Sequence, residues 1–466
     1  MSPVLLLESK LADLCSFNWP VCKKTFVVQI NGTAMTSAAM QINDTFHISD
    51  EHFPHSYWPV LSWNLGGAAA PLFALPLMEH FGVRRSYLVI YIFLIIFNIP
   101  QAFAQNFATL IITRIITGGC SGVLANITGG IVSDIWRDSR SKSFSISLFI
   151  WGLLAGLSMG PVIGSIVVQY ASWRWIFFSQ IILYSIFAPV LLLLPEVRPD
   201  VILSRRAAQV RNSAGKLVYT NSERTRTSPK EILKETIVRP TRMLITEPVV
   251  LSFGLWSAFC IGTAFMFTQS ITQVYTSLYS WSFFGTGIVQ SAVVVGELIG
   301  LVASIYQDKL YFRSSIENTE KPGRPIPEAR LYLSIPGSFV GLAAGLFWYA
   351  WTSYSTLHWI IPTIGLGFVG FGMFCVVTAV TGYIMDAYSK YAASAIAGVA
   401  FLENFFAAFL PLATQGMYSN LGFQWSSSLL GFLALILSFI PLVLQSYGRV
   451  IRDRSPFMRD AAHAIS

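Results

Sequence analysis

The chain has 466 residues, of which 54% are hydrophobic and only 12% are charged, and its formal net charge is +8. A soluble domain carries roughly 25% charged residues, so this composition excludes an ordinary soluble protein. Basic loops between apolar segments explain the positive charge better than a nucleic-acid surface does, and no nucleic-acid partner is expected. None of the five cysteines forms a C-x-x-C pair, so neither a disulfide framework nor a metal site is predicted.

The first apolar segment, over residues 25–46, is a weak candidate for a membrane span. It is unusually polar, with Gln29, Asn31, Thr33, Thr36, Ser37, Gln41 and Asn43. A helix that faces lipid does not carry so many polar groups. The segment therefore lines a pore, is a shortened remnant of a span, or does not span at all.

Eleven stronger apolar runs follow, each near the ~20 residues that a helix needs to cross a bilayer. They cover residues 56–78, 86–105, 107–132, 143–169, 174–194, 249–272, 282–305, 331–352, 358–384, 393–417 and 424–446. With the weak first segment they predict an all-α polytopic membrane protein of twelve spans.

Basic residues alternate with the spans along the chain. The loops after the second, fourth, sixth and eighth spans are rich in Lys and Arg, and the loops between them hold almost none. The stretch from Pro195 to Pro248 has eleven Lys and Arg against six Asp and Glu. Since cytoplasmic loops carry the excess of Lys and Arg, both termini and this stretch are predicted to be cytoplasmic. The plasma membrane is expected, with the vacuolar membrane as the alternative.

The long basic loop divides the spans into two sets of six. We predict a cytoplasmic tail over residues 1–24, a six-helix bundle over 25–194, a basic linker over 195–248, a second six-helix bundle over 249–446 and a cytoplasmic tail over 447–466. Within the linker, residues 229–239 are expected to form a short surface helix.

The loop after the second span holds an acid followed by a glycine and two basic residues. These are Glu79, Gly82, Arg84 and Arg85. An acid at the end of a span can pair with basic residues and with a nearby helix N-terminus, which would latch the loop. The alternative is an ordinary basic turn on the cytoplasmic side.

The fifth span carries the most specific pattern, a glycine at every fourth position with a proline beside the third. The residues are Gly152, Gly156, Gly160, Pro161 and Gly164. Glycines at this spacing leave one helix face without side chains, so a second helix can approach closely. Pro161 lacks an N–H donor and clashes with the carbonyl of Leu157, so a bend is predicted there. Simple packing of small residues is the alternative.

Arg114 lies within the fourth span, four residues before Gly118. A charge at this depth costs about 2.5–3.5 kcal/mol on insertion scales, so it usually faces a polar cavity or a partner. Alternatively, its long side chain reaches the membrane surface.

Together these motifs resemble those of the major facilitator superfamily. The glycine-proline pattern is similar to the fifth-span antiporter motif of its fungal twelve-span drug:proton antiporter branch, and Arg114 with Gly118 is similar to a fourth-span motif. The loop motif departs from the family pattern, since Glu79 stands where the family has Asp. The resemblance implies two six-helix bundles related by pseudo-two-fold symmetry. It also implies a transporter without enzymatic activity or a cofactor, monomeric in the bilayer, that exports a drug, toxin, secondary metabolite or polyamine in exchange for protons.

Few acids inside the spans could carry the proton. Glu297 lies in the eighth span and Glu403 in the eleventh. A carboxyl group among apolar side chains holds its proton more tightly, so it can exchange it near neutral pH. Arg114 is a third candidate for coupling. The alternative for both acids is a hydrogen-bonded group that fixes helix packing.

Substrate contacts are predicted from aromatic and amide side chains, which suit amphipathic or cationic organic molecules. The candidates are Phe265, Gln269, Gln273 and Asn404, with core packing as the alternative. Asn43 heads an N-x-T sequon that we expect to be external and glycosylated. The rival functions are a proton-coupled nutrient importer of the same fold, a transport-defective truncated relative, a membrane enzyme and a sensor.

Overall fold

The computed structural model describes residues 19–50, 54–136, 138–192, 196, 199–214, 219–220, 229–318, 323 and 325–463. Within these residues every regular element is a helix. Seven helical stretches of the described chain are long and apolar enough to cross a membrane, and the last of them runs from Ile360 to Arg454 through several helices. An all-α polytopic membrane protein is thus confirmed.

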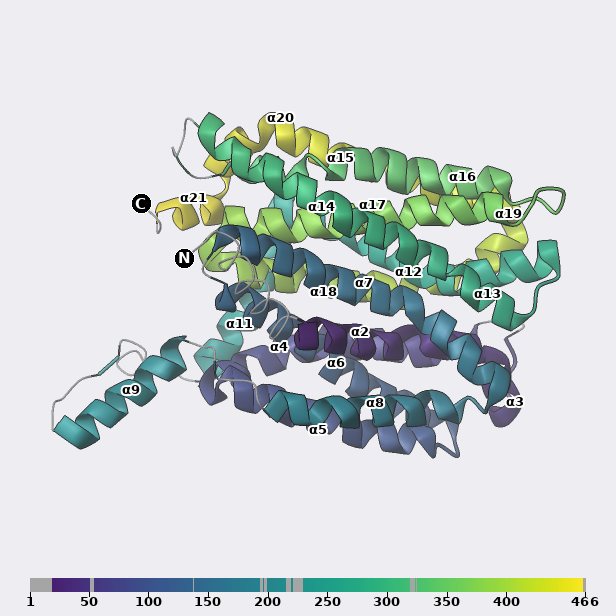
Figure 1. Ribbon diagram of the computed structural model, residues 1–466, viewed down its shortest axis with the longest axis horizontal. Helices are drawn as coiled ribbons and strands as arrows, with labels where there is room; N and C mark the ends of the chain where they lie inside the picture. The colour runs from purple at the N-terminus through teal and green to yellow at the C-terminus, as the bar shows by residue number, and fades with distance from the viewer. Residues whose placement is uncertain are drawn as a thin grey trace, which may run out of the picture.

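The first half of the chain forms a bundle that ends with α8 (Figure 1). Its helices are α2 (Trp19–Ala34), continued through a 3₁₀ turn into α3 (Ala39–Phe46), then α4 (Trp58–Phe81), α5 (Val83–Ala102), α6 (Phe107–Ile135), α7 (Ser139–Tyr170) and α8 (Arg174–Leu192).

The second half repeats this plan after a linker whose described helices are α9 (Pro199–Ala214) and α11 (Pro229–Thr246). Its helices are α12 (Pro248–Tyr279), α13 (Phe283–Val289), α14 (Ser291–Glu317), α15 (Ser334–Pro336), α16 (Gly345–Thr352), α17 (Ile360–Tyr388), α18 (Ala392–Phe409), α19 (Thr414–Leu437), α20 (Phe439–Arg454) and α21 (Pro456–His463). A π-helical stretch, Gly337–Ala344, joins α15 to α16. The helix α19 is kinked at Gly422, whose φ is 79°, so its two parts belong to successive spans.

The packing of helices repeats from one half to the other. In the first half α2 packs on α7 and α4 packs on α6, and in the second α12 packs on α18 and α14 packs on α17. Further contacts join the halves, and the two most extensive are α7 with α14 and α4 with α18. We call these two contacts the seams. The matched pairs have the pseudo-two-fold arrangement that the motifs implied.

Glycine allows the closest of these approaches. A Cβ on Gly118 of α6 would meet the backbone of Trp63 on α4. In the second half, a Cβ on Gly296 of α14 would meet the backbone of Gly367 on α17. Helices in lipid associate through such close backbone contacts, because no hydrophobic force drives them together there.

The polar first segment forms a continuous helical path from Trp19 to Phe46, longer than the predicted 25–46. Its polar groups bond to other helices: Gln29 accepts from Ser121, and Gln41 accepts from the backbone N–H of Trp173. The polar groups that make this segment a weak candidate from sequence therefore form hydrogen bonds inside the first half. It is not among the stretches that meet the hydropathy criterion for crossing a membrane.

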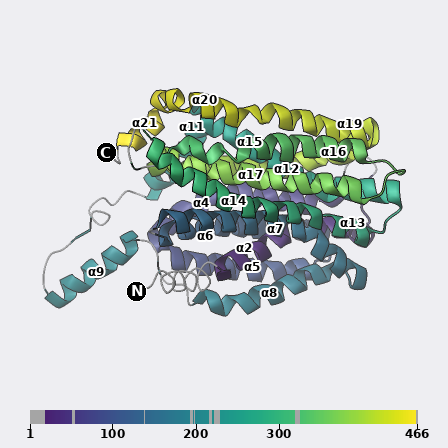
Figure 2. The same ribbon diagram turned by 45° about the horizontal axis from the view of Figure 1, so that its top comes forward.

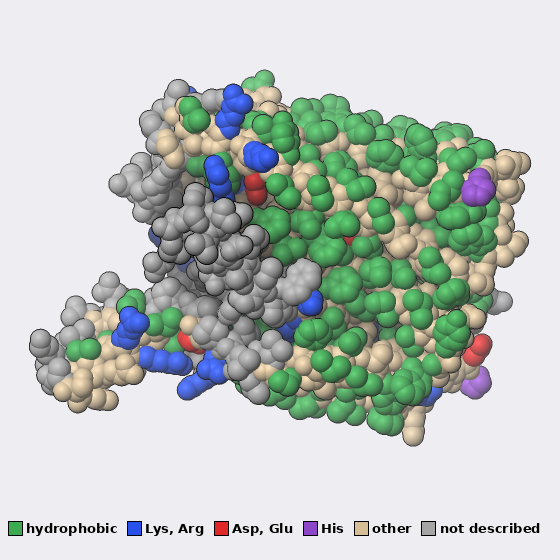
Figure 3. All heavy atoms as spheres, in the orientation of Figure 1, with side chains coloured by type: hydrophobic (Ala, Val, Ile, Leu, Met, Phe, Trp, Pro, Cys, Tyr) green, Lys and Arg blue, Asp and Glu red, His purple; other side chains and the backbone are tan. Residues whose placement is uncertain are grey.

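The two ends of the molecule differ (Figures 1 and 2). The helices α9, α11 and α21 lie at one end, which we call the linker end, and α3 and α13 lie at the other, the far end. Side chains of Lys and Arg gather at the linker end, while hydrophobic side chains cover much of the surface between the ends (Figure 3). An apolar band of this kind suits the hydrocarbon core of a bilayer.

Two helices at the linker end are longer than the sequence predicted. The surface helix predicted over residues 229–239 extends to Thr246, and it packs on α18 and α4. The last span, predicted to end at residue 446, continues as α20 to Arg454. In both cases polar residues hide the continuation from a hydropathy criterion, because the helix emerges from the apolar band while it keeps its backbone hydrogen bonds.

Candidate functional site at the seams

The glycine face of α7 holds the first segment of the chain. A Cβ on Gly156 would meet the carbonyl oxygen of Phe26, and one on Gly164 would meet the backbone of Ala34. At Gly160 the nearest atom is the hydroxyl of Thr33. Gly152 is also buried. The close approach predicted for this face is present, and the helix that makes it is α2.

Pro161 lies within α7, which continues as one helix from Ser139 to Tyr170. The proline leaves the carbonyl of Leu157 without its helical donor. The Thr33 hydroxyl donates to that carbonyl at 2.7 Å, and the Ser37 hydroxyl donates to the carbonyl of Pro161 at 2.8 Å. The Thr33 hydroxyl thus replaces the bond that the proline removes, and the Ser37 hydroxyl adds a second tie to the same turn.

The opposite side of α7 faces the other half. Ser158, two residues after Gly156, donates its hydroxyl to Oε1 of Glu297 at 2.8 Å. Glu297 is 1% exposed, and its Oε2 has no hydrogen-bond partner in the described part of the chain. This bond crosses the seam between α7 and α14, so the predicted acid and the glycine helix belong to one site.

Glu403 and Asn404 lie by the second seam but point in different directions. The Ser257 hydroxyl on α12 donates to Oε1 of Glu403, a bond within the second half. Asn404 faces α4, because a Cβ on Gly67 would lie 2.8 Å from its Oδ1. Its amide also donates to the carbonyl of Ala400, one turn back in α18.

Arg114 is fully buried inside the first half. Its guanidinium donates to the carbonyls of Asn31 and Gly32, to Oδ1 of Asn31 and to the carbonyl of Pro59, at 2.5–3.0 Å. It therefore ties α6 to α2 and α4. The partners of the guanidinium are protein groups, and the side chain does not reach the membrane surface. This agrees with the interpretation that a charge at this depth faces a partner.

The substrate candidates of α12 lie at different depths. Phe265 is 2% exposed in the core. Gln269 and Gln273 are half-buried, and the Nε2 of Gln269 has no hydrogen-bond partner in the described chain. No recorded hydrogen bond links these side chains to Glu297 or Arg114 within the described residues. Their role in binding stays a prediction.

At the loop after the second span, Glu196 binds the N-terminus of α5. Gly82 has a φ of 86°, which glycine adopts without strain. Glu196, just after α8, accepts from the backbone N–H groups of Val83 and Arg84, both at 3.2 Å, at the N-terminus of α5. Arg84 and Arg85 are exposed. The side chain of Glu79 lies outside those that the structure describes, so the predicted latch stays a prediction.

Asn43 lies in the last turn of α3 at the far end. It is half-buried, and its amide donates to Oδ2 of Asp50 at 2.7 Å. Glycosylation of its sequon stays a prediction.

A polar network joins the halves at the linker end. The Ser143 hydroxyl on α7 donates to Oδ1 of Asp308 on α14 at 2.6 Å, and Arg330 donates to that hydroxyl at 2.6 Å. Arg330 also forms an ion pair with Asp386 at 2.9 Å. At the far end the hydroxyl of Tyr57 donates to the carbonyl of Ala407 at 3.2 Å across the second seam. The halves are therefore in contact near both ends.

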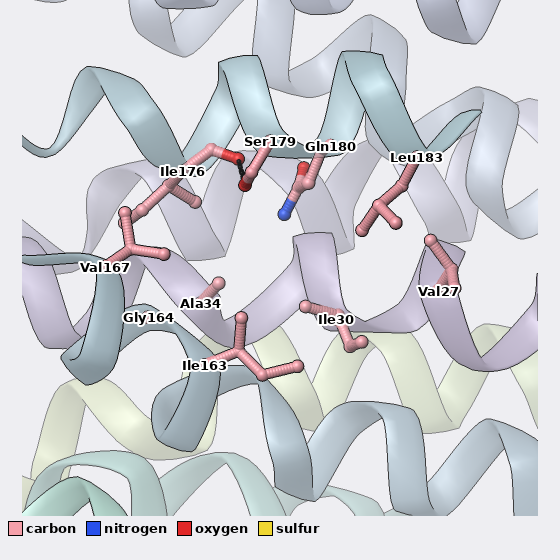
Figure 4. Close-up of a pocket in the computed structure, with 10 residues that line it drawn as sticks. All are labelled: Val27, Ile30, Ala34, Ile163, Gly164, Val167, Ile176, Ser179, Gln180 and Leu183. Atoms are coloured by element: carbon pink, nitrogen blue, oxygen red, sulfur yellow. Dashed lines mark hydrogen bonds between the residues drawn. The ribbon is translucent and has the colours of Figure 1, made fainter. Parts of the chain in front are cut away.

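An apolar pocket lies beside the glycine face, between α2, α7 and α8 (Figure 4). Among its lining residues, Ile30, Ala34 and Gly164 belong to the packed pair α2 and α7. Gln180 of α8 points toward α2, and neither atom of its amide group has a hydrogen-bond partner among the described residues. The pocket does not include Glu297 or its partner.

Three residues of the site were missed from sequence. Ser158 stands between two of the motif glycines, and its position on the opposite helix face could have revealed it. Asn31 and Ser143 could not be recognised from local sequence. Arg114, which bonds to Asn31, lies 83 residues away in the chain, and Asp308, which bonds to Ser143, lies 165 residues away.

The family is decided by a match to a protein-family model. Residues 25–411 match the model of the Major Facilitator Superfamily. The chain belongs to this superfamily. The match confirms the resemblance stated from the motifs, and it makes the chain a member of a transporter family rather than of an enzyme family.

Similar curated proteins are fungal. The MFS transporter cpaT of Aspergillus oryzae is 36% identical over 63% of this chain and 59% of its own length. The efflux pump FUB11 of Gibberella fujikuroi is 31% identical over 66% and 54%, and the multidrug transporter FLU1 of Candida albicans is 33% identical over 66% and 50%. The chain thus spans between half and three fifths of these relatives.

Solved structures confirm the fold. The proton:xylose symporter XylE, bound to 6-bromo-6-deoxy-D-glucose, matches with a TM-score of 0.66 over 93% of this chain and 95% of its own. The inward-open XylE of E. coli matches with a TM-score of 0.63 over 93% and 99%. Both are 14% identical in sequence, so they speak for the fold alone.

Proposed function

We propose that this member of the superfamily exports a small organic molecule in exchange for protons by alternating access, with Glu297 as the proton carrier. The observation that carries the proposal is the Ser158–Glu297 hydrogen bond across the seam between α7 and α14. Fungal efflux pumps and multidrug transporters among the relatives support export of a small molecule.

The geometry gives the carboxyl a reason to change its protonation as the halves move. In the described part of the chain no ion pair neutralises Glu297, and an ionised carboxylate is costly to bury alone. The closed seam therefore favours the protonated acid, held by Ser158. When the seam opens, water reaches the carboxyl and the proton can leave.

The orientation belongs to the same proposal. The basic linker end would face the cytoplasm of the plasma membrane, following the charge alternation. A C-terminal epitope that antibodies reach in intact cells, without permeabilisation, would contradict this orientation.

A growth-inhibition panel of toxic compounds first identifies an exported molecule, by comparing cells with and without the chain. Proteoliposomes with an imposed pH gradient then test the coupling. In Glu297→Gln, which keeps the size of the side chain but cannot ionise, gradient-driven transport should fall to background while substrate binding persists.

Two matched variants control this experiment. Ser158→Ala removes the hydrogen bond but leaves the carboxyl, so gradient-driven transport should continue. Glu403→Gln neutralises the other acid predicted as a proton carrier, and it should also leave coupling intact. Coupling that survives in Glu297→Gln and disappears in Glu403→Gln would reassign the proton carrier.

A further inference from the structure

A buried lysine of the first segment has no part in the proposed proton exchange. Lys24 lies on α2 and is 2% exposed, and its Nζ has no hydrogen-bond partner in the described chain. The preceding Lys23 is exposed. A buried ammonium group normally has an anionic or hydrogen-bonding partner, because its desolvation is costly.

Two tyrosine rings surround this amine. Nζ lies 3.6 Å from the ring centroid of Tyr87 and 4.2 Å from that of Tyr91, both on α5. The negative face of an aromatic ring attracts a cation, so these contacts favour the charged ammonium. They hold the cation in place but supply no counter-charge.

The amine lines a small polar pocket between α2, α5 and α6. Its other polar walls bond to each other: Ser121 donates to Gln29 at 3.1 Å, and the hydroxyls of Tyr87 and Thr128 are 3.3 Å apart. Among the described residues that line the pocket there is no Asp or Glu. We call it the Lys24 pocket.

We propose that the Lys24 pocket binds the carboxylate of an organic anion that the chain transports. A carboxylate would supply the missing counter-charge and accept charge-assisted hydrogen bonds from Nζ. Lys24 is the one cationic side chain among the described lining residues, which matches a monoanion, whereas a phosphate group usually takes several charged donors. The proposal rests on the proposed export function and names its substrate class.

The position of the pocket connects binding to the moving parts. Gln29, one wall of the pocket, also packs against α7, since a Cβ on Gly156 would lie 2.9 Å from its Cβ. Ser158 follows on the opposite face of α7 and holds Glu297. An anion in the pocket would thus sit one helix away from the seam.

Binding is tested on the purified full chain in dodecyl maltoside, without transport. Sodium acetate and sodium benzoate are compared with benzamide, at ionic strength balanced by sodium chloride. At ten times its dissociation constant a bound carboxylate should raise the unfolding midpoint by about 1–2 °C, while benzamide should not. Lys24→Gln should lose this shift and Lys23→Gln should keep it.

Three results would overturn the proposal: no shift with either carboxylate, an equal shift with benzamide, or a larger shift with inorganic phosphate than with benzoate. The comparison of probes on the unmodified chain needs no variant, so it stands even where Lys24→Gln fails to fold. Lys24→Arg, which keeps the charge, should retain part of the shift.

Export of a panel of aromatic acids and their neutral amides separates this proposal from the proposed function. Export of acids that falls at least tenfold in Lys24→Gln, but not in Lys23→Gln, supports the pocket. Export of amides or cations alone would reject the substrate class while the export function stands. If no compound is exported although benzoate binds, the export function fails and the anion site remains without its role in transport, which rejects the proposal as stated.

Discussion

Thr33 shows how one hydroxyl can decide whether a proline is tolerated in a neighbouring helix. It is buried, it donates to the Leu157 carbonyl that Pro161 leaves free, and it lies against Gly160. From sequence it is one more polar residue in a weak span. Its partner lies 124 residues later, and no local pattern connects the two.

We expect Thr33→Val to destabilise the protein by about 1–3 kcal/mol, because the substitution keeps the shape but leaves a buried carbonyl without a donor. Thermal unfolding of the purified protein measures the loss. Thr36→Val is the matched control, since the Thr36 hydroxyl donates only to the carbonyl of Thr33 in its own segment. Equal losses in the two variants would show that the contact with α7 contributes nothing particular.

The predictable residues were those whose chemistry is unusual for their surroundings. Glu297 and Arg114 stand out in apolar runs, and the structure gives both of them buried partners. Lys24 did not stand out, because it lies near the end of a segment where a lysine is expected to reach the membrane surface. Its burial depends on two tyrosines of another helix.

At the scale of the element, the glycine pattern of α7 predicted a close contact but not its partner. A four-residue spacing defines a face, and any of several helices could have occupied it. That α2 does so follows from its own small and polar residues, such as Ala34 and Thr33, which fit against a backbone without side chains.

Gly156→Ala should therefore destabilise the pair of helices, by about 1–3 kcal/mol, since its Cβ would meet the backbone of Phe26. The matched control is Gly130→Ala on α6, where a Cβ would meet nothing within 4 Å. Alanine there should stabilise the helix by up to about 1 kcal/mol. Unfolding midpoints in the same detergent give both values, and a stabilising Gly156→Ala would contradict the packing described.

The hydropathy pattern predicted the strong spans, but it misplaced the ends of helices that extend beyond the apolar band. It began the first segment at residue 25 rather than at Trp19, and it ended the last span at residue 446 rather than at Arg454. In both places the helix continues through polar residues, because its backbone bonds persist where side chains reach solvent or protein.

At the scale of the whole molecule, the contacts between the halves define what would have to separate in the proposed alternating access. Ser143 bonds to Asp308 and Arg330 at the linker end, and Tyr57 bonds to Ala407 at the far end. Alternating access requires each set to break while the other holds. The two-half plan was predictable from the basic linker and the superfamily resemblance, whereas these cross-half pairs were not.

A cross-link at the linker end should hold the halves together there. In the double variant Ser143→Cys and Asp308→Cys, mild oxidation should form a disulfide and stop transport, and a reductant should restore it. Counterflow in proteoliposomes measures the effect. The two single variants are the controls and should transport equally with and without oxidant. Full transport by the oxidised double variant would mean that this end never opens.

The two sides of α7 are held by unlike means. Toward α2 the contact is backbone against backbone over several turns, with Thr33 and Ser37 anchored to carbonyls of the proline turn. Toward α14 the recorded mid-helix bond is one hydroxyl on one carboxyl. The two halves would thus separate along the side of α7 that faces α14. Separation there would keep α2 packed on the glycine face and would expose the acid to water.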